Sequence, residues 1–193
     1  MKQVTSINGK LFPYFCCKTW QQVLPPNSAI EIMPINIRAA VPTDTPQIFQ
    51  FICDLAEYEK ASKEVKCTPE SLAASLFCDP STAYALMIEH KGQPIGYAIY
   101  FYNYSTWLAT KGLYLEDLYV DPAHRGKGAG ILLMKMLAEK ARAQGCKRFE
   151  WSVLDWNTPS IEFYNAIGAK PQDEWLGYRL EGEALDLLAN SQS

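Results

Sequence analysis

The sequence predicts an α/β fold of the α+β kind: a single domain with a mixed central sheet and helices on both of its faces. Two observations carry this prediction. Two helix-like segments separate the first strand-like segment from residues 84–89 and 95–102, and a short turn joins these two later segments into an antiparallel hairpin. After the hairpin, strand patterns and helix patterns alternate towards the end of the chain.

The composition is that of an ordinary globular protein. Of the 193 residues, 48% are hydrophobic and 20% are charged. The net charge of -3 provides no basic field for nucleic acid, and no apolar run is long enough to span a membrane. The six cysteines form neither a CxxC pair nor a zinc-ligand spacing, so we expect no metal site and free thiols in a reducing cytoplasm.

Residues 1–34 are expected to be an N-terminal extension to a domain that covers residues 35–193. They show no lasting period, and the alternation typical of a strand begins only at Ile35. Three interpretations stay open: an upstream extension without fixed structure, an organelle transit segment, or a start codon set too early. The transit segment is the weakest of the three because the stretch contains no arginine.

The first half of the domain contains three predicted strands and two predicted helices. Residues 35–39 alternate as a strand, and Thr43 to Pro46 then supply the capping oxygens and the first-turn proline of a helix. Thr68 caps a second helix, which Asp79-Pro80 ends. The residues expected to face the core in these helices are Ile48, Phe51, Ile52, Leu55, Leu72, Leu76 and Phe77.

The second half starts with a predicted loop over residues 103–112 and a strand over 113–120. We then expect a helix with Ile131, Met134, Ala138 and Ala141 on its apolar face, followed by a strand over 147–154. A short helix after Thr158-Pro159 ends at Gly168, which is typical of a left-handed C-cap. A last strand over 174–181 and a terminal helical turn complete the prediction.

The connection between the 113–120 strand and the following helix carries the strongest motif. Asp121-Pro122 ends the strand because proline has no N–H to give to a ladder. The run from Arg125 to Gly130 then enters the helix, and its glycines let the backbone turn sharply and expose its N–H groups. Those groups lie at the positive end of the helix dipole, which favours an anion such as a phosphate.

This ordered pattern resembles the acetyl-coenzyme A motif of the GNAT N-acetyltransferases. The pattern is Arg125-x-x-Gly128-x-Gly130 after an acidic strand, and it lacks the Gly-Lys-Ser/Thr of a Walker A loop and the third glycine of a Rossmann fingerprint. The resemblance covers residues 35–180. It implies a GNAT-like fold, acetyl-coenzyme A as cosubstrate and direct transfer to an amine.

Two further segments resemble one subgroup of this family, the diamine (spermidine/spermine-type) acetyltransferases and their thialysine-acetylating relatives. They are Tyr114 to Val120 and the run Trp156-Asn157-x-Pro159-Ser160-Ile161-x-Phe163-Tyr164. One position departs from the polyamine enzymes: Ser105 stands where they tend to place an acidic residue, two positions before Trp107. The acceptor, a polyamine or an amino-acid-like amine, therefore stays open.

Transfer to an amine requires a base. A primary amine of pKa near 10.4 is only about 0.1% neutral at pH 7.4, so deprotonation costs about 4 kcal/mol. Glu116, beside the glycine-rich connection, is the candidate general base. Its neighbour Asp117 should point to the opposite face, unless a bulge redirects one of the two. The alternative interpretation is that both carboxylates are solvated on a sheet edge.

The departing thiolate requires an acid, and Tyr164 is the candidate. Its phenol has an ordinary pKa near 10, close enough to that of a thiol for proton transfer. From the residues alone Tyr164 is better explained as part of the core, together with Phe163. The resemblance favours the catalytic role, because the family places its proposed acid at the matching position.

The remaining site predictions concern binding. We expect the backbone N–H groups of the connection to hold the pyrophosphate, and the resemblance implies that the strand before it pairs with the pantetheine arm, with further contacts from the short helix. Arg125 could instead form a surface salt bridge, which would contribute little. The predicted cofactor-binding residues are Leu118, Tyr119, Val120, Arg125, Gly126, Lys127, Gly128, Ala129, Gly130, Asn157, Ser160, Phe163 and Tyr164.

For the acceptor amine we expect Glu59, Glu116 and Asp117 to provide negative charge and Trp107 to form an apolar or cation–π wall. Glu59 is equally well explained as part of a solvated helix end. The resemblance implies a homodimer, so that a second chain could contribute to the acceptor site. The predicted function is amine N-acetylation, and the alternatives are a protein or peptide N-acetyltransferase and a non-catalytic sensor of acetyl-coenzyme A.

Overall fold

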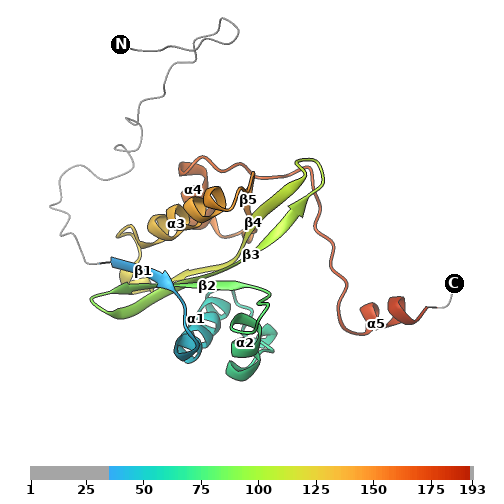
Figure 1. The fold of residues 1–193 in the computed structure, drawn as a ribbon, viewed down its shortest axis with the longest axis horizontal. Coiled ribbons are helices and arrows are strands. Elements are labelled where there is room, and N and C mark those ends of the chain that lie inside the picture. Colours follow the sequence, from blue (N-terminus) through green and yellow to red (C-terminus); the bar gives the residue numbers. More distant parts are fainter. Residues whose placement is uncertain (1–34, 192–193) are drawn as a thin grey trace, which may run out of the picture. The chain divides into compact units, whose positions relative to one another are not determined.

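The computed structural model describes residues 35–191 (Figure 1). These form two compact units, 35–152 and 153–191. The first contains β1 (Ile35–Ala39), α1 (Thr45–Tyr58), α2 (Pro69–Leu76), β2 (Tyr84–His90), β3 (Gln93–Ser105), β4 (Thr110–Val120), α3 (Ala129–Ala143) and β5 (Phe149–Trp151). The second contains α4 (Thr158–Ala166) and α5 (Gly182–Asn190). The predicted extension, residues 1–34, lies outside the described residues.

The sheet is mixed, as predicted. Its strands follow the order β1-β2-β3-β4-β5, and every neighbouring pair from β1 to β4 is antiparallel. Only β4 and β5 are parallel, and they pair over three residues, from Leu113 with Phe149 to Leu115 with Trp151. The predicted hairpin is β2 and β3, joined at a turn in which Lys91 and Gly92 both have positive φ.

Helices cover both faces of the sheet in the first unit, with α1 and α2 on one face and α3 on the other (Figure 1). The α1 face is closed by a cluster of buried residues: Ile48, Phe51, Leu72, Leu76, Met87, Tyr97, Ile99 and Tyr119. Ile52, Leu55 and Phe77 pack against this cluster, which confirms the predicted inner faces of both helices.

The residues that α3 buries differ in part from those predicted. Leu133 and Leu137 are fully buried, whereas Ala138 is exposed. Two leucines exclude more apolar surface from water than an alanine does, so the helix turns to bury them. Met134 and Ala141 are buried as expected.

Three further predictions of secondary structure need correction. The loop expected over 103–112 shrinks to residues 106–109, because β3 and β4 continue as a paired ladder to Ser105 and Thr110. The strand expected over 147–154 is only β5, Phe149–Trp151. The strand expected over 174–181 is wrong: no described strand pairs with these residues, and alternation alone cannot satisfy a strand's backbone without a neighbour.

In the second unit, the ends of α4 and the terminal helix agree with the predictions from the sequence. Asn157 is the N-cap of α4, and its side chain accepts a hydrogen bond from the Ser160 N–H at 3.4 Å. Gly168, beyond the end of α4, has the predicted left-handed conformation with φ of 86°. The predicted terminal turn is the helix α5.

Candidate active site

The connection between β4 and α3 is a rigid turn. The Asp121 N–H bonds the Ile95 carbonyl at 2.8 Å, and Asp121 Oδ1 accepts the Ala123 N–H at 2.8 Å. A short 3-10 turn follows, Pro122–His124. Gly126 and Gly128 then take left-handed conformations, with φ of 70° and 89°, which other residues adopt only under strain. The turn therefore depends on glycine at these two positions.

The N–H groups at the end of this turn, from Gly126 to Gly130, can bind an anion. The first bond of the helix ladder runs from the Leu132 N–H to the Gly128 carbonyl at 3.1 Å, so the N–H groups just before Leu132 have no acceptor within the helix. The N-cap, Gly128, provides no side-chain cap, and a Cβ built on Gly126 would meet no heavy atom within 4 Å. Bare N–H groups at the positive end of a 15-residue helix suit a pyrophosphate.

Arg125 contacts residues of its own compact unit. Its Nε donates to the Val120 carbonyl at 2.7 Å, and its guanidinium lies 5.0 Å from the ring centre of Tyr58 and 5.5 Å from that of Tyr119. No carboxylate among the described residues forms an ion pair with it. Arg125 thus connects the end of β4 to the end of α1, and the surface salt bridge considered for it does not form.

The edge of β4 that faces β5 is open beyond Leu115. Pairing with β5 covers only Leu113 to Leu115, and β4 continues to Val120 with no described strand on that edge. Main-chain groups of Leu118 and Val120 point towards this open edge, whereas those of Tyr119 and Asp121 point towards β3. A ligand with amide groups, such as a pantetheine arm, could pair there as a strand would.

A β-bulge at Glu116 decides where the acidic pair points. Tyr100 pairs with Leu115 and Ile99 pairs with Asp117, so Glu116 is the extra residue. The bulge reverses the alternation. Leu115 lies on the α3 face, but Asp117 lies with Ile99 on the α1 face, because paired residues share a face. Glu116 itself is exposed.

Asp117 belongs to an acidic cluster on the α1 face, together with Glu59 and Tyr97. The Tyr97 hydroxyl donates to Asp117 Oδ2 at 3.0 Å. Burial raises the pKa of the Asp117 carboxyl, the Tyr97 hydrogen bond lowers it, and the charge of Glu116 raises it. Burial also raises the pKa of Glu59, and the charge of Asp117 adds to that increase.

Within residues 35–191 this cluster forms no ion pair with a basic side chain. No lysine, arginine or histidine of the described residues forms an ion pair with Glu59 or Asp117. Both carboxylates are partly desolvated, and the charge of Asp117 raises the proton affinity of Glu59, so a cation bound beside them would stabilise their charged forms. The structure thus brings together Glu59 and Asp117, and Glu116 lies next to Asp117 in β4.

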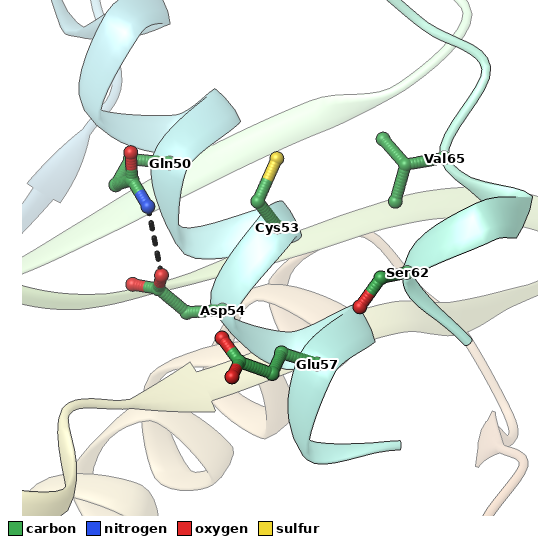
Figure 2. Close-up of a pocket in the computed structure, with 6 residues that line it drawn as sticks. All are labelled: Gln50, Cys53, Asp54, Glu57, Ser62 and Val65. Carbon is green, nitrogen blue, oxygen red and sulfur yellow. Dashed lines mark hydrogen bonds between the residues drawn. The ribbon is translucent and has the colours of Figure 1, made fainter. Parts of the chain in front are cut away.

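A separate pocket of about 210 Å³ lies along α1 (Figure 2). Its lining residues are Gln50, Cys53, Asp54 and Glu57 of α1 with Ser62 and Val65 of the following connection. Gln50 Nε2 donates to Asp54 Oδ1 at 2.8 Å, the dashed contact in Figure 2. Neither Glu59 nor Asp117 lines this pocket, so it is distinct from the acidic cluster.

Trp107 does not join the acidic cluster of its own chain. It lies in the turn at the tip of the β3–β4 hairpin and is 86% exposed. From Thr110, where β4 begins, to Asp117 the strand rises about 23 Å. Ser105 closes this tip, because its Oγ accepts the Leu108 N–H at 3.3 Å. The role predicted for Trp107 stays a prediction.

The predicted site residues of α4 are described within the second unit. Asn157 is buried and caps the helix, so its side-chain oxygen already serves the Ser160 N–H. Phe163 and Tyr164 are half-buried, with ring centres 5.3 Å apart. The roles predicted for these four residues stay predictions.

Tyr97 is the site residue that sequence reasoning missed. It lies in an apolar strand and looks like a core residue. The available signal was its hydroxyl, because a buried phenol usually has a hydrogen-bond partner. Among the described residues, no group of three or more histidine, cysteine, aspartate or glutamate side chains could hold a metal, and no helix has the length and apolarity needed to cross a membrane.

Comparisons with known proteins agree with this arrangement. The model of the acetyltransferase (GNAT) family matches residues 49–169. This range includes residues of both compact units, and the match confirms the predicted fold class, a single α/β domain. The chain is 40% identical to thialysine N-epsilon-acetyltransferase of Sus scrofa, over 80% of this chain and 97% of that protein. It is 30% identical to L-ornithine N5-acetyltransferase NATA1 of Arabidopsis thaliana, over 84% and 94% respectively.

A solved structure supports the fold. An integron cassette protein of V.cholerae superposes with a TM-score of 0.69 at 29% identity, covering 82% of this chain and 99% of that one. The resemblance to the diamine and thialysine subgroup noted in the sequence is thus confirmed by relatives along most of the chain.

Proposed function

Because the chain belongs to the acetyltransferase (GNAT) family and is an amine N-acetyltransferase, we propose that its acceptor is the side-chain amine of a small, cationic, amino-acid-like molecule. The observation that carries this proposal is the acidic cluster of Glu59 and Asp117, which has no counter-charge among the described residues. Relatives named for thialysine and L-ornithine acetylation support this class of acceptor.

The family implies acetyl-coenzyme A, which supplies an activated acetyl thioester, and the residues present fit it. The N–H groups of residues 126–130 would hold the pyrophosphate. The open edge of β4 at Leu118 and Val120 would pair with the pantetheine arm. Lys127 Nζ donates to the Ala123 carbonyl at 2.9 Å, which leaves further donors of its ammonium group for a phosphate.

Glu116 is proposed as the general base. The bulge leaves it exposed, at the point where β4 loses β5 as a neighbour, so its carboxylate is accessible to the acceptor. It would take a proton from the acceptor ammonium, directly or through water. Asp117 lies on the α1 face with Glu59 and instead holds the positively charged acceptor.

Tyr164 is proposed as the general acid. Its Oη would give a proton to the sulfur that leaves the acetyl group. Asn157, Ser160 and Phe163 would support the cofactor from the same helix. Among these, Asn157 acts through the helix cap that it provides.

The proposal includes a cytoplasmic homodimer. Cys53, Cys67, Cys78 and Cys146 are free thiols, as is usual in a reducing compartment. The tip of the β3–β4 hairpin, with Trp107, lies far from the acidic cluster of its own chain. A second chain would allow Trp107 to form a wall against the acceptor's cation.

The experiment that tests the proposal is the release of free thiol from acetyl-coenzyme A with a panel of acceptors. The panel contains thialysine, lysine, ornithine, spermidine, spermine, short diamines and a peptide amine. We expect the highest kcat/KM with an amino-acid-like amine. A preference for spermidine or spermine would show that the acceptor is a polyamine and not an amino-acid-like amine. Thiol release with the peptide alone would indicate a protein substrate. Tight cofactor binding without thiol release from any amine would indicate a sensor.

A further inference from the structure

Tyr97 is fixed in the core of the α1 face. Its side chain is fully buried. Its ring is stacked on that of Phe51, with centres 6.0 Å apart and planes 9° apart, and lies 6.5 Å from the ring of Tyr119. These contacts need only an aromatic ring, and a phenylalanine would make them equally well.

The hydroxyl of Tyr97 has one described partner, Asp117. The Oη–Oδ2 distance is 3.0 Å, and no described donor bonds Oδ1, the other oxygen of the carboxylate. Burial raises the pKa of Tyr97 well above its ordinary value, and the charge of Asp117 raises it further. The phenol therefore stays protonated and always donates. It fixes one carboxylate oxygen and leaves the other for a ligand.

We propose that Tyr97 is a positioning residue of the acceptor site, which holds the Asp117 carboxylate oriented and ionised so that Oδ1 can bind the acceptor's cationic group. This inference rests on the proposed function, because it assumes that Asp117 binds a cationic acceptor. Tyr97 itself touches neither acceptor nor cofactor.

The hydrogen bond is needed because Asp117's other surroundings oppose its charge. Burial disfavours the carboxylate, and Glu116 in the same strand adds negative charge. The titratable and charged groups that act on this cluster are Glu59 after α1, Cys67 before α2, Tyr97 of β3 and Glu116 of β4. Those that act on the neighbouring Tyr119 are Asp54 and Glu57 of α1, and Asp121 and Arg125 after β4. Only Arg125 among them is a cation, and its guanidinium lies over Tyr119 and Tyr58.

The direction of the pH effect follows from these contacts. The Tyr97 hydrogen bond lowers the pKa of Asp117. Removing the hydroxyl raises that pKa, so that Asp117 becomes protonated at a higher pH and loses its attraction for a cation. Acceptor binding should therefore weaken first at the acidic end of the pH range.

The test is Tyr97→Phe, with Tyr100→Phe as matched control. Tyr100 lies in the same strand, is also buried, and faces away from Asp117, since it pairs with Leu115 on the α3 face. For Tyr97→Phe we expect the acceptor KM near neutral pH to rise about tenfold, as for loss of a hydrogen bond to a charged group. The acid limb of the kcat/KM profile should move up by about one pH unit. We expect kcat at saturating acceptor, the KM for acetyl-coenzyme A and all constants of Tyr100→Phe to stay within twofold.

A direct titration keeps this test separate from the proposed function. The carboxyl group of Asp117 is followed by carbon NMR in the whole protein, and its pKa should be higher in Tyr97→Phe than in the parent. An unchanged Asp117 pKa together with an unchanged acid limb overturns the inference. If the parent releases no thiol with any small amine, the proposed acceptor fails, while the titration still decides whether Tyr97 holds Asp117 ionised.

Discussion

The glycine-rich turn before α3 and the acidic cluster under α1 bind by opposite means. The turn presents main-chain N–H groups from consecutive residues, Gly126 to Gly130, and its only side-chain requirement is glycine where φ is positive. The cluster presents side chains from three elements, Glu59 after α1, Tyr97 in β3 and Asp117 in β4. A cofactor common to a family can be bound by backbone, whereas a particular acceptor requires particular side chains. Changes in the two regions should therefore alter different kinetic constants.

The largest effect should come from Tyr164, which lies outside both regions. Tyr164→Phe should lower kcat by roughly 10²–10⁴, because the leaving thiolate loses its acid. Both KM values should stay nearly unchanged. Steady-state kinetics with thialysine, and Tyr178→Phe as a control at a 93% exposed tyrosine, check this. A rate within a few-fold of the parent would exclude Tyr164 as the acid.

Gly128→Ala should weaken the binding of acetyl-coenzyme A without weakening the binding of the acceptor. The left-handed backbone at φ of 89° disfavours a Cβ by about 1–2 kcal/mol, and relief of that strain would displace the exposed N–H groups. We expect the KM for acetyl-coenzyme A to rise about tenfold, with the acceptor KM unchanged. Gly145→Ala, at φ of 73° beyond the end of α3, introduces the same strain away from the turn. Equal effects of the two variants would contradict a role of the turn in cofactor binding.

Glu116→Gln should change the pH dependence more than the affinity. Without a base, the reaction depends on the small fraction of acceptor that is already neutral, so the pH optimum should move upward. A pH profile of kcat/KM measures this, with Glu139→Gln on the exposed side of α3 as control. An unmoved profile would remove Glu116 from the role of base.

The same comparison explains how far the sequence could predict the molecule. The turn is encoded in consecutive residues, Asp121 to Gly130, and its position and neighbouring elements were predicted correctly. The cluster is assembled from residues far apart in the chain. Its geometry depends on the bulge at Glu116, and no local pattern distinguishes a bulge from regular alternation in an acidic pair.

Errors in the strands have a similar origin. The β3–β4 hairpin is longer than predicted because the two strands stay paired through polar residues, such as Asn103 with Gly112. Asn103 Nδ2 also donates to Glu150 of β5 at 3.0 Å. Residues 174–181 have the alternation of a strand but pair with no described neighbour. In each case the deciding factor is a partner strand, which lies elsewhere in the sequence.

The central claim is that charge on the α1 face selects the acceptor, and the most direct test is to measure both KM values of Asp117→Asn. The change keeps the shape of the side chain and removes its charge. We predict that the acceptor KM rises at least tenfold, the usual range for a lost hydrogen-bonded charge, while the KM for acetyl-coenzyme A stays within twofold. Asp54→Asn, which removes a charge from the separate pocket along α1, should change neither. An acceptor KM unchanged in Asp117→Asn, or raised equally in both variants, would contradict the account.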